Sequence, residues 1–375
     1  MKDKLPAKLR AVTLFLCCAV LTLLGGGARA EEDVETGARA AVLIERNTGM
    51  VLLCHNENEP LPMASTTKVM TALLALEKGN LDDVVTVGRN AYGVPGTSIY
   101  LNLGEHITLR NLLYGLLLAS GNDAAVAIAE HIGGSVEAFC TMMTERAAEL
   151  GCENTVFVNP NGLPAEGHHT TAYDLALIAR EAMKHETFRE IVSTRRASIP
   201  WEGRSYDRIL NNKNRLLTDY EGATGIKTGF TSKAGRCLVF SAEREGMELI
   251  GVVLNCGTWF DSAERLLDWG FANYSLAEAA HAGEAAARAA VRGGEEKSVE
   301  LRAEADVAAA VCEGDAWRVV LEADELRAPV QAGQVCGRIA LEVNGEILAQ
   351  ANLLAAQDVA RWDFWAALRR IFRRF

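Results

Sequence analysis

Ser65-Thr66-Thr67-Lys68 opens a long run of helix-forming residues near the N-terminal end of the chain. The segment just before it, residues 58–63, contains two prolines, and a helix cannot continue across them. We therefore predict that a helix begins at or beside Ser65. Residues three positions apart share one face of a helix, so we expect the Ser65 hydroxyl to lie next to the Lys68 amine.

A serine beside a lysine in this geometry can act as a nucleophile with its own base. A hydroxyl is a weak nucleophile at neutral pH, and an amine can take its proton if burial or another cation lowers the pKa of the amine. A helix N-terminus adds partial positive charge and free N–H groups near an attacking oxygen. For an isolated S-x-x-K, a serine N-cap followed by a surface lysine is nevertheless the commoner meaning. Partners elsewhere in the chain must decide between the two interpretations.

Two further motifs supply such partners. Ser120-Gly121-Asn122 follows an apolar helical stretch, and Lys227-Thr228-Gly229 precedes a pair of strand-like runs. Each motif is common by itself. The ordered set S-x-x-K, S-x-N and K-T-G is specific, because three short patterns must coincide at plausible spacings. Nearly the same set marks active-site serine penicillin-binding proteins and class A β-lactamases.

On these motifs the chain resembles the low-molecular-mass penicillin-binding proteins, which are serine-type D-alanyl-D-alanine carboxypeptidases of peptidase family S11. The likeness covers about residues 35–356 and is least specific in the last part. The stretches that support it are Pro62–Lys68, Ala119–Ala125, Asn159–Leu163, Thr170–Leu175 and Lys227–Gly235. The resemblance implies an α/β (α+β) fold, with a helix-flanked antiparallel sheet, a helical subdomain and a small C-terminal all-β domain.

The chemistry and the resemblance together imply the catalytic roles. Ser65 would attack the carbonyl of the penultimate D-alanine of a peptidoglycan stem peptide and form an acyl-enzyme. Lys68, held near neutral by burial and by Lys227, would be the general base. Ser120 would relay the proton to the leaving amine. Asn122 would hydrogen-bond the substrate amide and order Lys68.

Substrate binding is expected at the K-T-G motif. Lys227 would supply positive potential, and Thr228 a hydroxyl near the terminal carboxylate of the substrate. Gly229 and Phe230 complete the predicted substrate-binding set, and the resemblance places the oxyanion hole at the backbone N–H groups of Ser65 and Phe230. Some family members carry an arginine after the last long strand, whereas the stretch here, residues 255–258, has none. No cofactor and no metal is expected, and β-lactam antibiotics are expected ligands of Ser65.

The pattern of apolar residues agrees with a single sheet built from both ends of a helical insert. Strands at the two ends of an insert indicate that distant segments form the halves of the sheet, which helices then cover. We predict strands at 40–45, 51–55, 237–243 and 247–254, and helices at 108–118, 123–131, 136–150, 173–184 and 261–274.

The 375 residues are 49% hydrophobic and 23% charged, which suits about two domains. Residues 1–30 have a basic start, an apolar stretch and an A-x-A ending, and they predict a secretory signal peptide. We expect a catalytic domain at 31–275, a small β-sandwich at 277–356 and an amphipathic helix at 357–375. The Trp, Phe and Arg content of that last segment favours an anchor on an anionic membrane surface, with a helix packed on the β domain as the alternative.

Charge and cysteine content exclude other classes of partner and site. Removing the signal peptide, of net charge +4, takes the net charge from −11 to −15, which argues against nucleic acid. Seven cysteines would remain without C-x-x-C spacing; buried thiols are the default, and a disulfide such as Cys237–Cys256 is the alternative. His168-His169 could suggest a metal, but a pair on a surface turn is the favoured interpretation.

Several rival functions stay open at this point. A class A β-lactamase needs a deacylating E-x-x-x-N pattern, and the stretch after Glu166 lacks the asparagine. A DD-endopeptidase or transpeptidase of the same fold is the nearer rival. A non-catalytic peptidoglycan-binding scaffold is the rival from another class, and the complete catalytic set argues against it.

Overall fold

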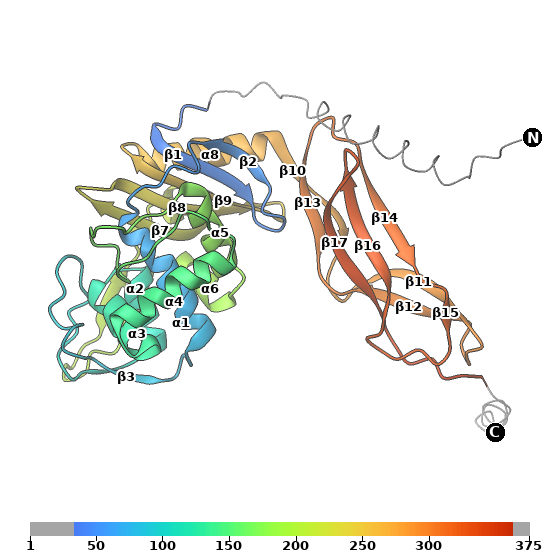
Figure 1. Cartoon of the computed structure of the whole chain (residues 1–375), viewed down its shortest axis with the longest axis horizontal. Coiled ribbons are helices and arrows are strands. Elements are labelled where there is room, and N and C mark those ends of the chain that lie inside the picture. The colour runs from blue at the N-terminus through green and yellow to red at the C-terminus, as the bar shows by residue number, and fades with distance from the viewer. Residues whose placement is uncertain (1–33, 363–375) are drawn as a thin grey trace, which may run out of the picture. The chain divides into compact units, whose positions relative to one another are not determined.

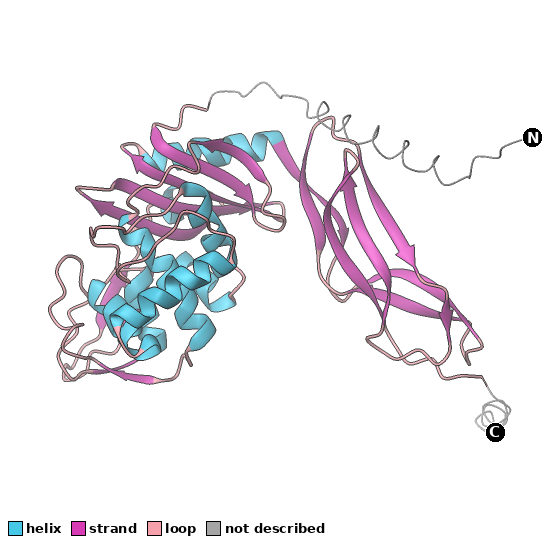
Figure 2. Ribbon diagram, viewed as in Figure 1, coloured by secondary structure: helices cyan, strands magenta, loops and turns pink. Residues whose placement is uncertain are grey.

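A computed structural model describes residues 34–362 of the chain. The predicted signal peptide, 1–30, and residues 363–375 of the predicted tail helix lie outside this range. All helices of the described residues lie before residue 274, and the elements after that point are strands (Figure 2). This division agrees with the predicted mixed α and β fold followed by a β domain.

The predicted catalytic region, residues 31–275, is organised around a five-stranded antiparallel sheet in the order β2-β1-β9-β8-β7 (Figure 1). Strand β1, from the N-terminal end, pairs with β9, from far along the chain. The prediction that distant segments share one sheet is therefore confirmed. The strands are β1 Ala38–Glu45, β2 Val51–His55, β7 Ala223–Thr231, β8 Gly235–Arg244 and β9 Met247–Cys256.

Helices cover the two faces of this sheet. On one face, Val42 and Val252 join a single core with α1 (Lys68–Lys78) and α5 (Ala172–Ala182). On the other face lies α8 (Trp259–Asn273), whose Gly270 rests on Leu249. A Cβ atom at Gly270 would come within 2.6 Å of Leu249 Cδ1, so the close approach of helix and sheet depends on glycine.

The helical insert between β2 and β7 begins its helices where the sequence provides caps. Thr108 and Ser135 accept hydrogen bonds from backbone N–H groups three residues on, at the starts of α2 and α4. The hairpin β5–β6 and helix α6 had not been predicted. The remaining elements are β3 Val84–Thr86, β4 His106–Thr108, α2 Leu109–Leu117, α3 Asn122–Gly133, α4 Val136–Glu149, α6 Glu186–Ser193, β5 Arg196–Ile199, β6 Arg208–Asn211 and α7 Leu216–Asp219.

The C-terminal region is all β, as predicted. A six-stranded sheet in the order β14-β16-β17-β12-β11-β15 shares a core with the two-stranded sheet β10-β13. Its strands are β10 Tyr274–Ala280, β11 Ala285–Arg292, β12 Ser298–Ala303, β13 Val307–Cys312, β14 Trp317–Ala323, β15 Leu326–Arg327, β16 Val335–Val343 and β17 Glu346–Ala355.

The start of the predicted tail helix needs correction. Val359 is buried and bridges to Val330, and Arg361 bridges to Gly294, so residues 357–362 are extended rather than helical. The buried Val359 holds this segment against the β domain. Among the residues that the structure describes, no helix is long and apolar enough to span a membrane.

A buried ion pair ties the β5–β6 hairpin to the rest of the insert. The Arg208 guanidinium binds both carboxylate oxygens of Glu105, at 2.6 and 2.7 Å, and both side chains are almost fully buried. Removing one partner of such a pair leaves an uncompensated charge in the interior.

We predict that Arg208→Met lowers the free energy of unfolding by about 3 kcal/mol, because Glu105 is left buried without a partner. Chemical denaturation followed by circular dichroism measures this change. Arg196→Met, at an exposed position on β5, is the matched control and should change stability little. Equal effects of the two substitutions would contradict the account.

Candidate active site

Ser65 and Lys68 are neighbours at the start of α1. Residues Ala64–Thr67 form one turn of 3₁₀ helix, and α1 begins at Lys68, so the predicted helix start is displaced by three residues. Ser65 is partly exposed, whereas Lys68 is completely buried. Their side chains meet, with Lys68 Nζ 3.0 Å from Ser65 Oγ. A helix cap followed by a surface lysine is therefore excluded.

The partners of the Lys68 amine are neutral oxygen atoms. Lys68 Nζ donates to Asn122 Oδ1 at 2.8 Å and to the Asn161 carbonyl oxygen at 2.6 Å. Burial lowers the pKa of Lys68 well below its ordinary value, and the positive charges of Lys227 and Lys213 lower it further. Burial and like charge thus favour the neutral amine, which can accept a proton from the adjacent hydroxyl.

The S-x-N motif lies where the insert meets this amine. Asn122 is the first residue of α3, and its Nδ2 donates to the Pro95 carbonyl at 2.7 Å, which directs its Oδ1 toward Lys68. Ser120 is buried and has a positive φ of 63°, a conformation that few residues other than glycine adopt. Asp123 accepts the backbone N–H groups of Ile99 and Leu101, and so fixes the neighbouring loop.

The K-T-G motif lies within β7, the edge strand of the sheet, and not at a strand end. Lys227 is buried and its Nζ donates to the Thr228 carbonyl at 2.8 Å. Burial, together with the charge of Lys213, lowers the pKa of Lys227 to about 7. A Cβ atom at Gly229 would lie 2.9 Å from the Ser65 nitrogen, so only glycine lets β7 approach Ser65 this closely. The Phe230 side chain is 63% exposed beside it.

Lys213 is a third cation near the site that the motifs did not reveal. It lies in the loop after β6, and its Nζ donates to Thr97 Oγ1 at 3.4 Å. Although the side chain reaches solvent, partial desolvation lowers the pKa of Lys213. Its charge in turn lowers the pKa values of Lys68 and Lys227. A lone lysine in a polar stretch carries no pattern by which the sequence could have identified it.

The loop that carries Asn161 is held against the S-x-x-K turn by His168. The prediction of a surface turn is wrong for His168, which is buried, because its ring joins two segments. Its Nδ1 accepts the Val158 N–H at 3.0 Å, and its Nε2 lies 2.9 Å from Thr67 Oγ1. Burial lowers the pKa of His168 to about 4, so the ring is neutral near pH 7.

Within residues 34–362, neither the cysteines nor the acidic and histidine side chains form a second candidate site. Cys237 and Cys256 are both buried free thiols, which contradicts the disulfide alternative for this pair. Within the same residues, no group of His, Cys, Asp and Glu side chains is arranged to hold a metal ion.

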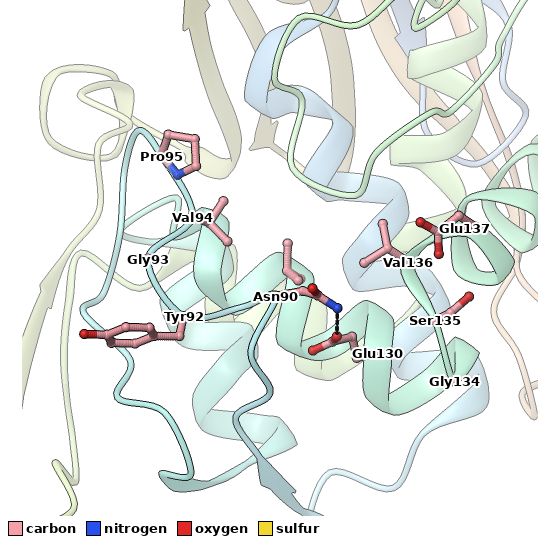
Figure 3. A pocket seen from close by; sticks show the side chains of 11 residues that line it. Asn90, Tyr92, Gly93, Val94, Pro95, Glu130, Gly134, Ser135, Val136 and Glu137 are labelled. Atoms are coloured by element: carbon pink, nitrogen blue, oxygen red, sulfur yellow. Dashed lines mark hydrogen bonds between the residues drawn. The ribbon is translucent and has the colours of Figure 1, made fainter.

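A groove of about 520 Å³ lies beside the site, between the loop before Gly96 and helices α3 and α4 (Figure 3). It adjoins the site through Pro95, which accepts the hydrogen bond from Asn122. None of the predicted site residues lines it. The lining residues are Asn90, Tyr92, Gly93, Val94, Pro95, Val126, Glu130, Gly134, Ser135, Val136 and Glu137.

Two family models match the chain. The D-alanyl-D-alanine carboxypeptidase family, peptidase S11, matches residues 27–258, and the C-terminal domain of penicillin-binding protein 5 matches residues 274–361. The two matches together cover the catalytic region and the β domain.

Individual relatives are similar in sequence to this protein along most of its length. The D-alanyl-D-alanine carboxypeptidase DacF of Bacillus subtilis is 37% identical, over 89% of this chain and 88% of that protein. The crystal structure of penicillin-binding protein 5 from Haemophilus influenzae is 32% identical, with a TM-score of 0.67 over 87% of this chain and 98% of that one. The Streptomyces K15 DD-transpeptidase is 35% identical, with a TM-score of 0.60 over 63% of this chain and 98% of that one. The chain belongs to the D-alanyl-D-alanine carboxypeptidase family, peptidase S11.

Proposed function

We propose that this enzyme removes the terminal D-alanine from peptidoglycan stem peptides that end in D-Ala-D-Ala, through an acyl-enzyme on Ser65. The observation that carries the proposal is the 3.0 Å contact between Ser65 Oγ and the buried amine of Lys68. A neutral amine at that distance can take the hydroxyl proton as the bond to the substrate carbonyl forms.

Acylation then needs a proton for the departing D-alanine. Ser65 Oγ bonds to the carbonyl carbon of the penultimate residue, and the C–N bond to the terminal D-alanine breaks. The proton that Lys68 accepted passes through the Ser120 hydroxyl to the leaving amine. Asn122 keeps Lys68 in place, because its amide is itself fixed by Pro95. Water releases the shortened peptide by the reverse use of the same base.

Among residues 34–362, β7 pairs with β8 on one side only, and its other edge suits an extended peptide. A substrate lying antiparallel to β7 would hydrogen-bond to its backbone as an added strand. Its scissile carbonyl would then face the Ser65 and Phe230 N–H groups, which we assign as the oxyanion hole. The close approach of Gly229 to the Ser65 nitrogen supports this placement.

Since this chain lacks the arginine that some family members carry after the last long strand, other positive side chains would have to bind the terminal carboxylate of the substrate. Residues 255–258, at the end of the last long strand of the sheet, contain no arginine. Lys213 and Lys227 are cations whose charges act on Lys68, and Thr228 adds a hydroxyl on the same strand as Lys227. We infer that these three groups together select a free carboxylate and thus a carboxypeptidase substrate.

β-Lactam antibiotics are expected to acylate Ser65 and to stay bound. The lactam carbonyl would occupy the position of the peptide carbonyl, and opening the ring leaves the amine attached to the acyl group. Glu166, the nearest acidic candidate for a deacylating base in the sequence, has no asparagine partner at the required spacing.

Transpeptidation is the second candidate, since the Streptomyces K15 DD-transpeptidase shares the fold of the catalytic region. Product analysis on whole peptidoglycan separates the two: free D-alanine with shortened stem peptides indicates a carboxypeptidase, and new cross-links indicate a transpeptidase.

The enzyme would act outside the cytoplasm, at the membrane surface. Residues 1–30 have the pattern of a signal peptide, and residues 357–375 carry a net charge of +3 on an acidic protein. Since residues 357–362 belong to the β domain, we place the anchor in residues 363–375. Aromatic residues with arginines favour the interface of an anionic bilayer.

Ser65→Ala should reduce D-alanine release from a peptide ending in D-Ala-D-Ala by at least about a thousandfold, because the acyl-enzyme cannot form. Ser193→Ala, at an exposed helix position, is the matched control. Full activity of a folded Ser65→Ala protein would refute the assigned nucleophile.

Lys213→Gln should move the acidic limb of the acylation rate to higher pH. Removing that positive charge raises the pKa of Lys68, so the neutral amine is populated only at higher pH. The rate of acylation by a fluorescent penicillin, measured across pH, tests this shift. Lys213→Arg retains the charge and should leave the limb in place; a limb that does not move in Lys213→Gln would contradict the electrostatic role.

Deleting residues 363–375 should reduce binding to anionic vesicles by at least tenfold, since about 1 kcal/mol is lost for each arginine near the surface. Activity on a soluble peptide should be unchanged. Co-sedimentation with phosphatidylglycerol vesicles measures the binding. A truncated protein that still sediments with them would exclude the tail as the anchor.

A further inference from the structure

The strand β14 forms an edge of the six-stranded sheet in the C-terminal domain (Figure 1). It pairs with β16 on one side, and no strand among residues 34–362 pairs with its other side. Trp317, Val319 and Leu321 on this strand are 47%, 40% and 49% exposed. A long edge strand with exposed apolar side chains is a template for pairing with another chain.

The exposed side chains of β14 continue the core face of the sheet. Alternate residues of a strand share one face, and cross-strand partners lie on the same face. The partners on β16 are all buried, so the apolar face extends past the part of the sheet that is covered. The pairs are Trp317–Val343, Val319–Leu341 and Leu321–Ile339.

The backbone N–H and C=O groups at the open edge of β14 belong to the residues whose apolar side chains are exposed. The Asn344 N–H donates to the Ala316 carbonyl, and the Asp324 N–H donates to the Cys336 carbonyl. Even-numbered residues of β14 therefore direct their backbone groups toward β16. In an antiparallel ladder the alternate residues direct theirs away, so residues 317, 319, 321 and 323 offer N–H and C=O groups at the open edge.

The opposite face of β14 carries charges in an alternating order. Arg318 pairs with Glu342 on β16, and both Nε and Nη2 lie 2.9 Å from carboxylate oxygens. Four residues along, Glu322 Oε2 accepts from Arg338 Nη2 at 2.8 Å. The open edge of this face thus presents one positive and one negative side chain, placed symmetrically about Val320.

We propose that β14 pairs antiparallel with β14 of a second copy of this chain, about a two-fold axis at Val320. In this register all seven residues of the strand are paired, and Val319 lies opposite Leu321 of the other copy. The outward-directed residues 317, 319, 321 and 323 oppose one another, so they exchange backbone hydrogen bonds in both directions. The contact is isologous, because both copies use the same surface.

The charges support this register. Arg318 of one copy lies opposite Glu322 of the other, and the reverse pair forms across the axis. Together with Glu342 and Arg338, each row across the two sheets then alternates in sign over four strands. Opposite charges on directly paired residues stabilise a sheet, and like charges destabilise it. The sequence of β14 is therefore complementary to itself in the antiparallel direction.

Charge reversal on the two positions provides the test. Arg318→Glu places two acidic residues opposite each other in its own dimer, and Glu322→Arg places two basic ones. A mixture of the two variants restores an opposite pair at every position. Sedimentation velocity on the chain from residue 31 onward, at about 1 to 500 μM, should show dimers of wild type with weak affinity. Each variant alone should dimerise at least about tenfold less tightly, and the mixture should regain the affinity.

Two further measurements keep the outcome decisive. Val319→Pro removes an outward N–H without touching the β16 pairing, and should abolish the dimer while D-alanine release stays unchanged. A cooperative thermal unfolding transition in each charge variant shows that the domain is folded. A wild type that stays monomeric, variants that dimerise as well as wild type, or a dimer lost only on deleting residues 363–375 would each overturn the proposal.

Discussion

The site depends on one unfavourable placement: the Lys68 amine is buried beside the Ser65 hydroxyl and hydrogen-bonds to neutral oxygen atoms. The charge of Asp123 raises the pKa of Lys68, but burial and two neighbouring lysines lower it more. Burying a charged ammonium without a counter-ion is costly, so the environment favours the neutral form. Lys68 Nζ hydrogen-bonds to neutral oxygen atoms of Asn122, Asn161 and Ser65. The two nearby lysines act in the same direction, because each repels a proton on Lys68. These surroundings make the Lys68 amine more able to accept a proton than a surface lysine is.

The fold supplies this environment from four separate segments. The sheet contributes β7 with Lys227, α1 contributes Lys68, α3 contributes Asn122, and the loop around Asn161 closes over the amine. Small residues permit the close contacts. Gly229 brings β7 onto the Ser65 nitrogen, and Gly162, with a φ of 88°, lies directly against the Ala64 carbonyl. The burial that lowers the pKa of Lys68 is thus a property of the whole catalytic region.

The sequence pointed to those site residues that belong to short motifs with recognisable spacing. Ser65, Lys68, Asn122 and Lys227 carry recognisable spacing, and the sheet strands carry apolar runs. Lys213 and His168 carry no such signal, because their roles depend on contacts with Thr97 and Thr67 that only the fold brings about. The β5–β6 hairpin was missed for a related reason: its stability comes from the buried pair of Arg208 with Glu105, far apart in sequence.

The C-terminal region shows the same limit. Alternation predicted strands there, but not that β14 would be an edge whose apolar residues stay uncovered, nor that the extended chain would run to Trp362. Sheet order is set by long-range pairing, which short patterns do not encode.

The central claim is that burial and neighbouring positive charge lower the pKa of Lys68 well below its ordinary value, so that its amine can act as a base. The most direct test is an NMR titration of protein labelled with ¹³Cε-lysine, with the Lys68 signal assigned by loss in Lys68→Met. The account predicts that this signal changes from the charged to the neutral form at a pH well below the ordinary lysine pKa of 10.5. A Lys68 amine that stays charged up to its ordinary pKa of 10.5 would contradict it.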